Sequence, residues 1–528
     1  KYREHLESLP QSHINQLRNT IQLKCDEAGL MEPGFFNLTV PTGGGKTIAS
    51  VIWALRHAIT FHKKRIIIAI PFTSIIVQTA KILREIFGVE NVIEHHSAVN
   101  VESSTAENSI SSQLACENWD APIVVTTNVQ LFESIFSNRP SACRKLHSIV
   151  DSIVILDEVQ SIPLTFMQPI INALRGYVKI FGTSFLFCTA SQPVLDGQHK
   201  GCNGATLNGI DKTIIRNIID NELLLHDQLR RVKINIENRL HSYESLATEI
   251  ERHKRVLCVV NSRKHALAIY NALSKDSDAE IFHLSRSMCS SHILATIDKI
   301  KSLLSDPEKS VRVVSTQLIE AGVDIDFPVV FRQLAGLDSI LQSAGRCNRE
   351  GKLKSGDTIV FQLENSQQKG YLQFATDTMK DMLSLYPDAD WLSPEIMKTY
   401  YNKLYTRTPS FDKEGIVDMA GFPTSCKFEE ISEKFHLIDE IGLNIIVNFG
   451  DSEKLIQQLI NIGPSRQLAR QLGRFSVNVS PRIFKEFRVA GLIEEPHPGF
   501  YFIPLRDQYD SAVGLKAGNE FIEQTLII

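Results

Sequence analysis

The sequence predicts an α/β protein with two tandem parallel-sheet domains and a small mixed α+β region towards its C-terminal end. The 528 residues are 43% hydrophobic and 22% charged, which is enough apolar material for several packed cores. Short β-branched runs alternate with stretches of helical periodicity, and this alternation is typical of parallel sheets covered by helices. A chain of this length corresponds to about three or four domains of typical size.

The expected strands form two series along the chain. A stretch rich in Gly and Asn, residues 198–210, is expected to be a surface loop near the end of the first series. We therefore expect a helical lead-in at 1–30, a first sheet domain at 31–225, a second at 226–385 and an accessory domain at 386–528. The expected strands are 36–40, 65–70, 123–126, 152–156 and 185–188, then 232–236, 256–260, 280–283, 311–315, 329–333 and 358–362.

The composition argues against several other classes of protein. The net charge is −4, so any affinity for nucleic acid must come from local patches. The nine cysteines include no C-x-x-C pair, which argues against a zinc ribbon and favours a reducing cytoplasm. The most apolar stretch, residues 66–76, is interrupted by Pro71 and is too short to cross a membrane. The sequence begins at Lys1 rather than Met, which we interpret as the downstream part of a longer protein.

A glycine-rich loop, PTGGGKT, follows the first expected strand and precedes a helical stretch at 48–62. Consecutive glycines let backbone N–H groups approach phosphate oxygens, so the loop is expected to bind ATP. Lys46 would contact the terminal phosphates, and the Thr47 hydroxyl would bind Mg²⁺. The alternative is a glycine turn before an ordinary helix, because Val40 stands where the strict motif has Gly. The predicted nucleotide-binding residues are Thr42, Gly43, Gly44, Gly45, Lys46 and Thr47.

An acidic pair, Asp157-Glu158, follows the expected strand 152–156. Acidic residues at the carboxyl end of a parallel strand face the crevice in which ligands bind to such sheets. Asp157 is expected to hold Mg²⁺, and Glu158 to polarise the water that attacks the γ-phosphate. Acidic residues also cap helices, so the pair carries weight only together with the glycine-rich loop.

Two arginines in the segment QSAGRCNR, Arg346 and Arg349, are three residues apart. On a helix this spacing would place both guanidinium groups on one face, where they could stabilise the charge of a transferring phosphoryl group. The alternative is an ordinary solvated basic helix. The preceding stretch STQLIEAGVDID argues against it, because its residues Gly322 to Asp324 follow a buried strand at the expected distance.

These motifs, together with TAS at 189–191 and in this order, resemble those of the superfamily-two helicases. The resemblance covers about residues 14–365 and implies a motor of two RecA-like domains with ATP between them. It implies that Gly322 and Asp324 contact nucleotide or strand, and that Gln22 or Arg18 reads the adenine. The residues implied to couple nucleotide to strand are Gln160, Thr189, Ser191 and Gln342.

A narrower resemblance lies in the connecting segments. Residues 117–147, LDEVQSIP and the HLS…MC run at 283–289 look like the CRISPR-associated Cas-three helicases of the type I-C-like branch. This family implies recruitment by a Cascade complex at an R-loop, followed by ATP-driven, 3′-to-5′ movement on displaced single-stranded DNA. It also implies an HD nuclease domain, which we expect upstream of this chain or in a separate one. We interpret the only His-Asp dipeptide, His226-Asp227, as a surface or linker pair.

Candidate strand contacts come from hydroxyls and arginines at strand ends and from a basic stripe near the C-terminal end. Hydroxyls in such places can bind backbone phosphates without reading sequence, although each alone is more often structural. The stripe has a four-residue spacing and is more often a solvated helix face than a lid over the strand. The candidates are Thr73, Thr126, Thr127, Ser262, Arg263, Thr316, Arg466, Arg470 and Arg474.

The sequence therefore predicts an ATP- and Mg²⁺-dependent translocase and helicase on single-stranded DNA. A superfamily-two motor that acts on RNA or in a restriction complex is the first alternative. The second is a nucleotide-gated binding module that recruits a partner without unwinding.

Overall fold

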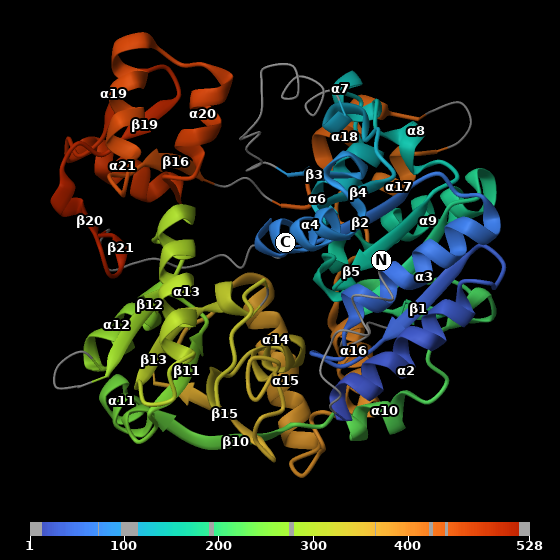
Figure 1. Ribbon diagram of the computed structural model, residues 1–528, viewed down its shortest axis with the longest axis horizontal. Coiled ribbons are helices and arrows are strands. Elements are labelled where there is room, and N and C mark those ends of the chain that lie inside the picture. The colour runs from blue at the N-terminus through green and yellow to red at the C-terminus, as the bar shows by residue number, and fades with distance from the viewer. Residues whose placement is uncertain are drawn as a thin grey trace. The chain divides into compact units, whose positions relative to one another are not determined.

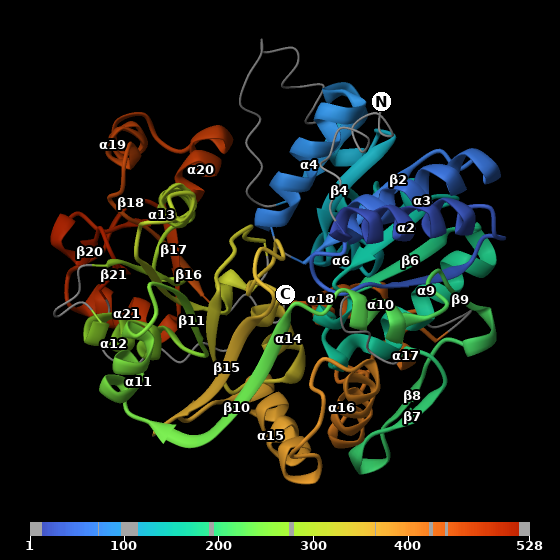
Figure 2. The same cartoon turned by 60° about the horizontal axis from the view of Figure 1, so that its bottom comes forward.

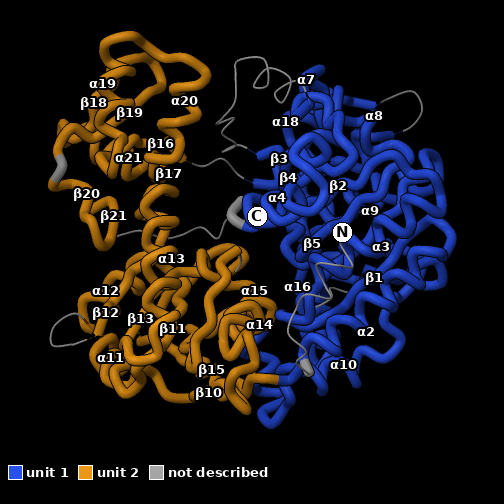
Figure 3. Tube along the Cα trace, viewed as in Figure 1, with its two compact units in different colours: residues 1–230, 378–438, 526–528 blue, residues 231–377, 439–525 orange. Residues whose placement is uncertain are grey.

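The computed structural model describes residues 13–71, 73–96, 115–189, 195–273, 279–320, 322–364, 366–421, 426–438 and 442–516 (Figure 1). The chain divides into two compact units (Figure 3). Unit 1 comprises residues 1–230, 378–438 and 526–528, and unit 2 comprises residues 231–377 and 439–525.

Unit 1 is built on a seven-stranded sheet in which every strand pairing is parallel (Figure 2). Its strands are apolar on both faces, as expected of a sheet covered by helices on both sides. In order across the sheet they are β3 (Val92–His95), β4 (Ile123–Thr127), β2 (Ile66–Ile70), β5 (Ile153–Asp157), β6 (Ser184–Thr189), β1 (Phe35–Thr39) and β9 (Ile215–Asn217).

The two faces of this sheet are covered by different helices. On one face, alternate strand residues such as Phe36, Leu38 and Val40 pack against α2 (His13–Ala28), α3 (Lys46–Phe61) and α4 (Thr73–Phe87). The buried residues of α3 recur at helical spacing, so one side of this helix contributes to the core. The opposite face packs against α6 (Asn128–Ile135) and α9 (Met167–Phe181).

The segment 378–438 adds helices to unit 1. Phe435 stacks on Phe136 with ring centroids 4.0 Å apart, and the Phe411 carbonyl accepts a hydrogen bond from the Gln168 N–H at 3.0 Å. The expected surface loop at 198–210 instead contains a hairpin, β7 (Gln198–Lys200) with β8 (Thr206–Asn208). The remaining helices of unit 1 are α7 (Pro140–Cys143), α8 (Leu146–Ile149), α10 (Glu222–Gln228), α16 (Pro394–Arg407), α17 (Ile416–Met419) and α18 (Phe428–Lys434).

Unit 2 contains a six-stranded sheet, again with every pairing parallel. One face packs against α11 (Tyr243–Glu251) and α12 (Arg263–Leu273), and the other against α13 (Ser290–Leu304). After the sheet, α15 (Gly370–Leu385) leads out of the unit. The strands in order are β10 (Val232–His241), β15 (Gly356–Leu363), β14 (Val329–Gln333), β11 (Arg255–Val260), β13 (Val311–Thr316) and β12 (Glu280–Leu284).

A smaller four-stranded sheet and its helices complete unit 2. It is anchored beside α13, where the Tyr509 hydroxyl accepts the Cys289 N–H at 3.0 Å and the Leu515 N–H donates to the Ser287 carbonyl at 2.8 Å. Its elements are β16 (Leu443–Ile446), β17 (Ser476–Val479), β18 (Glu494–His497), β19 (Phe500–Phe502), α19 (Ser452–Ile462), α20 (Arg466–Gly473) and α21 (Pro481–Val489), with a hairpin of β20 (Tyr509–Asp510) and β21 (Gly514–Leu515).

The structure confirms the α/β class and every strand of the two expected series, although β10 extends to His241, five residues beyond the expected end. Two strands of the first sheet, β3 and β9, were not expected from the sequence. The segment expected as one accessory domain, 386–528, is divided: its first part belongs to unit 1 and its second part to unit 2. The reason is packing, since Phe435 lies in one core and Tyr509 against another. Within the described ranges, no helix is both long enough and apolar enough to cross a bilayer.

Candidate functional site

The glycine-rich loop connects β1 to α3 in unit 1, as expected. Gly43 and Gly45 have φ values of 80° and 82°, a left-handed conformation that favours glycine. A Cβ on Gly44 would lie 2.4 Å from the Val40 side chain and 3.1 Å from the Pro41 carbonyl oxygen. Each of the three glycines is therefore required for the backbone to take this path.

Val40 does not disturb the loop, although the strict motif has Gly there. Its side chain is fully buried in the core beneath α2 and α3, and its N–H donates to the Thr189 carbonyl at 3.1 Å. Val40 thus continues the geometry of β1, and the loop proper starts after it.

A chain of polar side chains starts at the first residue of α3. Lys46 Nζ lies 3.2 Å from Glu158 Oε1, and the exposed fractions of these two side chains are 10% and 16%. The Gln160 amide donates to the other Glu158 oxygen, and the Thr189 hydroxyl donates to Gln160 Oε1 at 2.6 Å. The structure thus brings together four predicted residues from three places in the sequence. Ser191 lies outside the described residues.

The carboxylates of the acidic pair, Asp157 and Glu158, repel each other. Burial, and then the negative charge of Glu158, raise the pKa of Asp157 to about 7, while Lys46 acts in the opposite direction. Glu158 has a φ of 49°, which is unusual for a residue with a side chain, and its N–H is held by Asp157 Oδ1 at 3.1 Å. A buried acidic pair beside one lysine is the kind of site that a divalent cation would stabilise.

The donor set fits Mg²⁺ with a nucleotide phosphate. Thr47 is exposed at the start of the sixteen-residue helix α3, whose first N–H groups attract anions. Asp157 supplies a carboxylate, a ligand type that Mg²⁺ prefers. The two residues predicted to hold the metal therefore stand at the ends of neighbouring segments, α3 and β5, of one unit.

Arg18 has a different contact from the predicted one. It was expected to read adenine, as the alternative to Gln22, but its Nε and Nη2 donate to the Gly43 carbonyl at 3.0 and 2.7 Å. Arg18 therefore braces the glycine-rich loop. Gln22, one helical turn further along α2, is buried at 9% exposure, and its adenine contact stays a prediction.

In unit 2, the two predicted arginines make different contacts. Arg349 Nε lies 3.1 Å from Asp324 Oδ1, and the two side chains are 31% and 66% exposed. Arg346 is buried and donates to the Ile319 and Glu320 carbonyls at 3.1 and 2.6 Å. The two guanidinium groups therefore have different surroundings.

The expectation that both arginines share one helix face is wrong. The helix α14 (Leu337–Ala344) ends before Arg346. Cys347 then forms a β-bridge with Phe327, and Asn348 takes a φ of 44°, so the chain turns between the two arginines. Gln342 remains inside α14 and is half-buried.

Sequence reasoning missed a buried polar network next to this segment. Arg332 in β14 is fully buried, and its Nε lies 2.8 Å from Oε1 of Glu320. Ser339 and Ser343 of α14 donate to the same carboxylate, and Asn261 accepts from Arg332 Nη1 at 2.7 Å. The signal was a charged residue within an apolar strand, since such a residue must find a partner.

Most of the predicted strand-contact hydroxyls have structural roles. Thr126 is fully buried and donates to the His95 carbonyl at 2.9 Å, so its hydroxyl is not available to a nucleic-acid strand. Thr127 accepts the Gln130 N–H as the cap of α6, and Ser262 accepts the His265 N–H. Thr316 is also buried.

The five remaining candidates for contact with a nucleic-acid strand lie at three places in the structure. Arg263 is half-buried at the start of α12. Thr73 begins α4, and its side chain lies outside the described part of the chain. The C-terminal stripe lies on α20, where Leu468 and Leu472 are buried and Arg466 is exposed. Arg470 and Arg474 are half-buried.

Comparison with known proteins agrees with this geometry. A model of the DEAD/DEAH box helicases matches residues 19–196, and a model of the CRISPR-associated nuclease/helicase Cas3 C-terminal region matches residues 252–352. The CRISPR-associated nuclease/helicase Cas3 of Haloferax volcanii is 24% identical in an alignment that covers 83% of this chain and 56% of the relative. Cas3 of Methanothermobacter thermautotrophicus is 27% identical in an alignment that covers 63% of this chain and 40% of the relative. The chain thus spans about half the length of the curated relatives it matches.

Solved structures show the same fold. T. fusca Cas3 with AMPPNP superimposes with a TM-score of 0.67 at 14% identity, over 96% of this chain and 72% of that one. A chain of the CRISPR RNA-guided surveillance complex, pre-nicking, gives a TM-score of 0.61 at 14% identity, over 96% of this chain and 70% of that one. The DEAD/DEAH box helicase model covers the segment of unit 1 that holds the phosphate loop and the acidic pair, so this segment is similar to that class of helicases. In sequence the chain is similar to Cas3 nuclease/helicases, and its fold is that of the Cas3 structures.

Proposed function

We propose that this chain is an ATP-dependent translocase and helicase that moves 3′ to 5′ on single-stranded DNA in type I CRISPR interference. The observation that carries this proposal is the chain of contacts Lys46–Glu158–Gln160–Thr189 within unit 1. It links the phosphate loop to the end of β6, as a coupling between the bound nucleotide and the bound DNA strand requires. The names of the relatives support the same function.

The residues of unit 1 have complementary roles in hydrolysis. Lys46, now paired with Glu158, would exchange this partner for the terminal phosphates, and the glycine-rich loop would hold the other phosphates with its N–H groups. Glu158 would then be free to accept a proton from the attacking water. Mg²⁺, held by Thr47 and Asp157, would neutralise charge on the phosphate oxygens.

Of the two arginines in unit 2, we propose Arg349 as the group that stabilises charge during phosphoryl transfer. Its ion pair with Asp324 is largely exposed, so the guanidinium can leave this partner at little cost. Arg346 holds the backbone of the Gln317–Glu320 segment, and we propose that it supports Arg349 by fixing that backbone.

We further propose that a Cascade-type complex recruits the chain to the displaced strand of an R-loop in the cytoplasm. A match to a chain of the CRISPR RNA-guided surveillance complex, pre-nicking, supports this partner. The relatives are named nuclease/helicases, and strand cleavage would require an HD nuclease domain, either upstream in cis or as a subunit in trans.

The test is ATP turnover by a Lys46→Ala variant. Turnover that single-stranded DNA stimulates should disappear, because the variant lacks the ammonium group that we propose binds the terminal phosphates. Lys179→Ala, which removes an exposed lysine of α9, is the matched control and should keep full activity. Turnover that persists in Lys46→Ala would refute the assignment of the site.

The alternatives predict different results in the same assays. A motor for RNA would be stimulated by RNA and not by single-stranded DNA. A nucleotide-gated binding module would bind a forked DNA substrate in an ATP-dependent way without multiple turnover or unwinding.

A further inference from the structure

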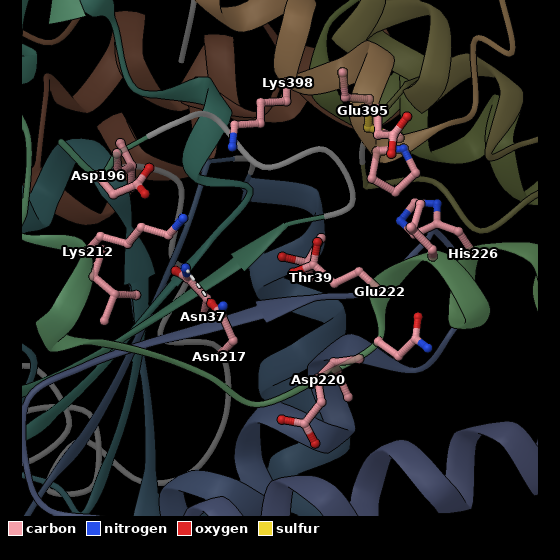
Figure 4. Close-up of a pocket in the computed structure, with 17 residues that line it drawn as sticks. Asn37, Thr39, Asp196, Lys212, Asn217, Asp220, Glu222, His226, Glu395 and Lys398 are labelled. Carbon is pink, nitrogen blue, oxygen red and sulfur yellow. Dashed lines mark hydrogen bonds between the residues drawn. The ribbon is translucent and has the colours of Figure 1, made fainter. Parts of the chain in front are cut away.

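Unit 1 contains a cavity of about 460 Å³ that none of the predicted site residues lines (Figure 4). It lies where β1 and β9 meet α10 and α16. Asn37 and Thr39 line it, and these residues alternate with Phe36, Leu38 and Val40, which belong to the core beneath α2 and α3. The cavity therefore opens on the opposite face of the sheet from that core.

One hydrogen-bond acceptor that lines the cavity, Asn37 Oδ1, has no donor among the described residues. The Asn37 side chain is 7% exposed, and its Nδ2 donates to Asn217 Oδ1 at 3.1 Å. Its Oδ1 is buried and accepts no hydrogen bond within the described part of the chain. A buried acceptor of this kind keeps its desolvation penalty unless a donor reaches it. An occupant that donates hydrogen bonds would remove this cost.

His226 adds a second polar atom, a ring nitrogen. Its Nε2 is buried without a partner among the described residues, and burial lowers the pKa of the imidazole to about 4. The ring is therefore neutral at pH 7 and adds no positive charge to the cavity. His226 was interpreted as a surface or linker residue, and it is half-buried in α10 beside the exposed Asp227.

The charges around the cavity are mainly negative. Four carboxylates line it, against two lysines, Lys212 and Lys398, which are both exposed. In Figure 4, Asp196 lies on one side of the cavity, and Glu222 and Glu395 lie on the other. Burial raises the pKa of Glu222, while the hydroxyl of Thr39 and the charge of Lys398 lower it. The balance of charge disfavours anions such as nucleotides and favours a cation.

The lining also contains apolar side chains. Leu195 and Met397 are buried, at 4% and 5% exposure, and Ile219 is half-buried beside them. The parts of these side chains that face the cavity are apolar. The cavity thus combines apolar contact area with separated acceptors for positive groups.

We propose that this cavity binds a linear aliphatic polyamine. The protonated amines would donate to Asn37 Oδ1 and to the carboxylates on both sides, and the methylene segments would lie against Leu195, Ile219 and Met397. The long stems of the two lysines let their ammonium groups turn towards solvent, away from the bound amines. This site is independent of the proposed helicase function.

The experiment is a calorimetric titration of spermidine into the whole chain, free of nucleic acid, at about 150 mM salt to screen weak surface binding. One saturable site is expected. Glu222→Gln should weaken binding about tenfold, because it removes a half-buried partner of an amine. Glu395→Gln should weaken it about two- to fivefold, because this partner is exposed. Lys398→Ala should tighten binding, since it removes a competing charge.

The matched control is Glu433→Gln, which removes an exposed carboxylate of α18 outside the cavity and should leave the affinity unchanged. Glu395 is exposed, so its variant should keep the melting temperature of the native chain and separates binding from folding. Absence of saturable binding, or equal affinity in all variants, would overturn the proposal. Weaker binding of spermidine in Lys398→Ala would also overturn it, because removal of a competing positive charge should strengthen the binding of a polycation in this cavity.

Discussion

Two ion pairs, one in each unit, differ in their burial and in the number of hydrogen bonds around them. In unit 1, Lys46 and Glu158 are 10% and 16% exposed and contact each other through a single pair of atoms at 3.2 Å. In unit 2, Arg332 and Glu320 are 0% and 6% exposed. Arg332 donates to Asn261 and Ser339, and Ser339 and Ser343 donate to Glu320.

This difference distinguishes an ion pair in a ligand-binding site from an ion pair that holds the fold together. A sparsely bonded pair near the surface can exchange its partner for a ligand, whereas a satisfied buried network can only be broken at a large cost. Arg346 and Arg349 show the same contrast over three residues, because Arg346 is bound to main-chain carbonyls and Arg349 to an exposed carboxylate. The residue type alone does not tell these roles apart.

The largest expected effect comes from breaking the buried network. Arg332→Met should destabilise the chain by about 3–5 kcal/mol, because it leaves the Glu320 carboxylate buried without its cation. Urea unfolding measures this change. The exposed Arg252, which pairs with Glu249 at 2.7 Å, gives the matched control Arg252→Met, for which we expect less than about 1 kcal/mol. A small effect for Arg332→Met would mean that this network is not a scaffold.

Arg349→Met should lower the rate of ATP hydrolysis and leave the stability of the chain nearly unchanged. Its ion pair is partly exposed, so stability should change by less than about 1 kcal/mol. The kcat of ATP hydrolysis should fall about 10²–10³-fold, as expected when a group that stabilises transition-state charge is removed. Steady-state kinetics with Lys352→Met as the control measure this. Unchanged kcat would show that Arg349 has no part in hydrolysis.

Thr189→Val tests the polar chain of unit 1 with almost no change in shape. The substitution removes the hydrogen bond to Gln160, which is worth about 1 kcal/mol. We expect stimulation of ATP turnover by single-stranded DNA to fall several-fold, while turnover without DNA is kept. If both rates fall equally, Thr189 supports the nucleotide site and does not couple it to the strand.

The smallest effect is expected at His283 in β12. Its ring is 2% exposed, neither ring nitrogen has a partner among the described residues, and burial lowers its pKa to about 4. The unfolded chain binds a proton below about pH 6.5 while the folded chain does not, so this histidine removes stability as the pH falls from about 6.5 to 4. His283→Leu should stabilise the chain by up to about 1 kcal/mol at pH 7, and by more at pH 5.

His292→Leu is the matched control for this prediction. Both nitrogens of His292 have partners, the Tyr509 hydroxyl and the Ser511 carbonyl, each at 2.9 Å. Its replacement should therefore destabilise unit 2. Unfolding curves at pH 7 and pH 5 compare the two variants, and a destabilised His283→Leu would show that its imidazole has a partner in solution.

Much of the nucleotide site follows from local sequence. Residues 41–47 carry their own turn chemistry, and Asp157-Glu158 ends an apolar strand, so both segments could be placed without knowledge of the rest of the chain. Residues 346–349 could not be placed in this way. Helical spacing predicted one face for both arginines, but the bridge from Cys347 to Phe327 ends the helix, and that bridge depends on a distant segment.

The sequence by itself determined the class of fold, the order of the strands along the chain and the identity of the phosphate loop, because these depend on periodicity and on residues close in sequence. Only the tertiary structure decided that the Thr126 hydroxyl donates to a backbone carbonyl and that Arg18 donates to the Gly43 carbonyl. It also decided that segment 386–528 is shared by two units. It also brought Asn37, Glu222 and Glu395 to one cavity. The physical reason is that burial and hydrogen-bond partners are properties of the packed chain, and a side chain of given type becomes a core residue, a cap or a ligand-binding group according to what packs against it.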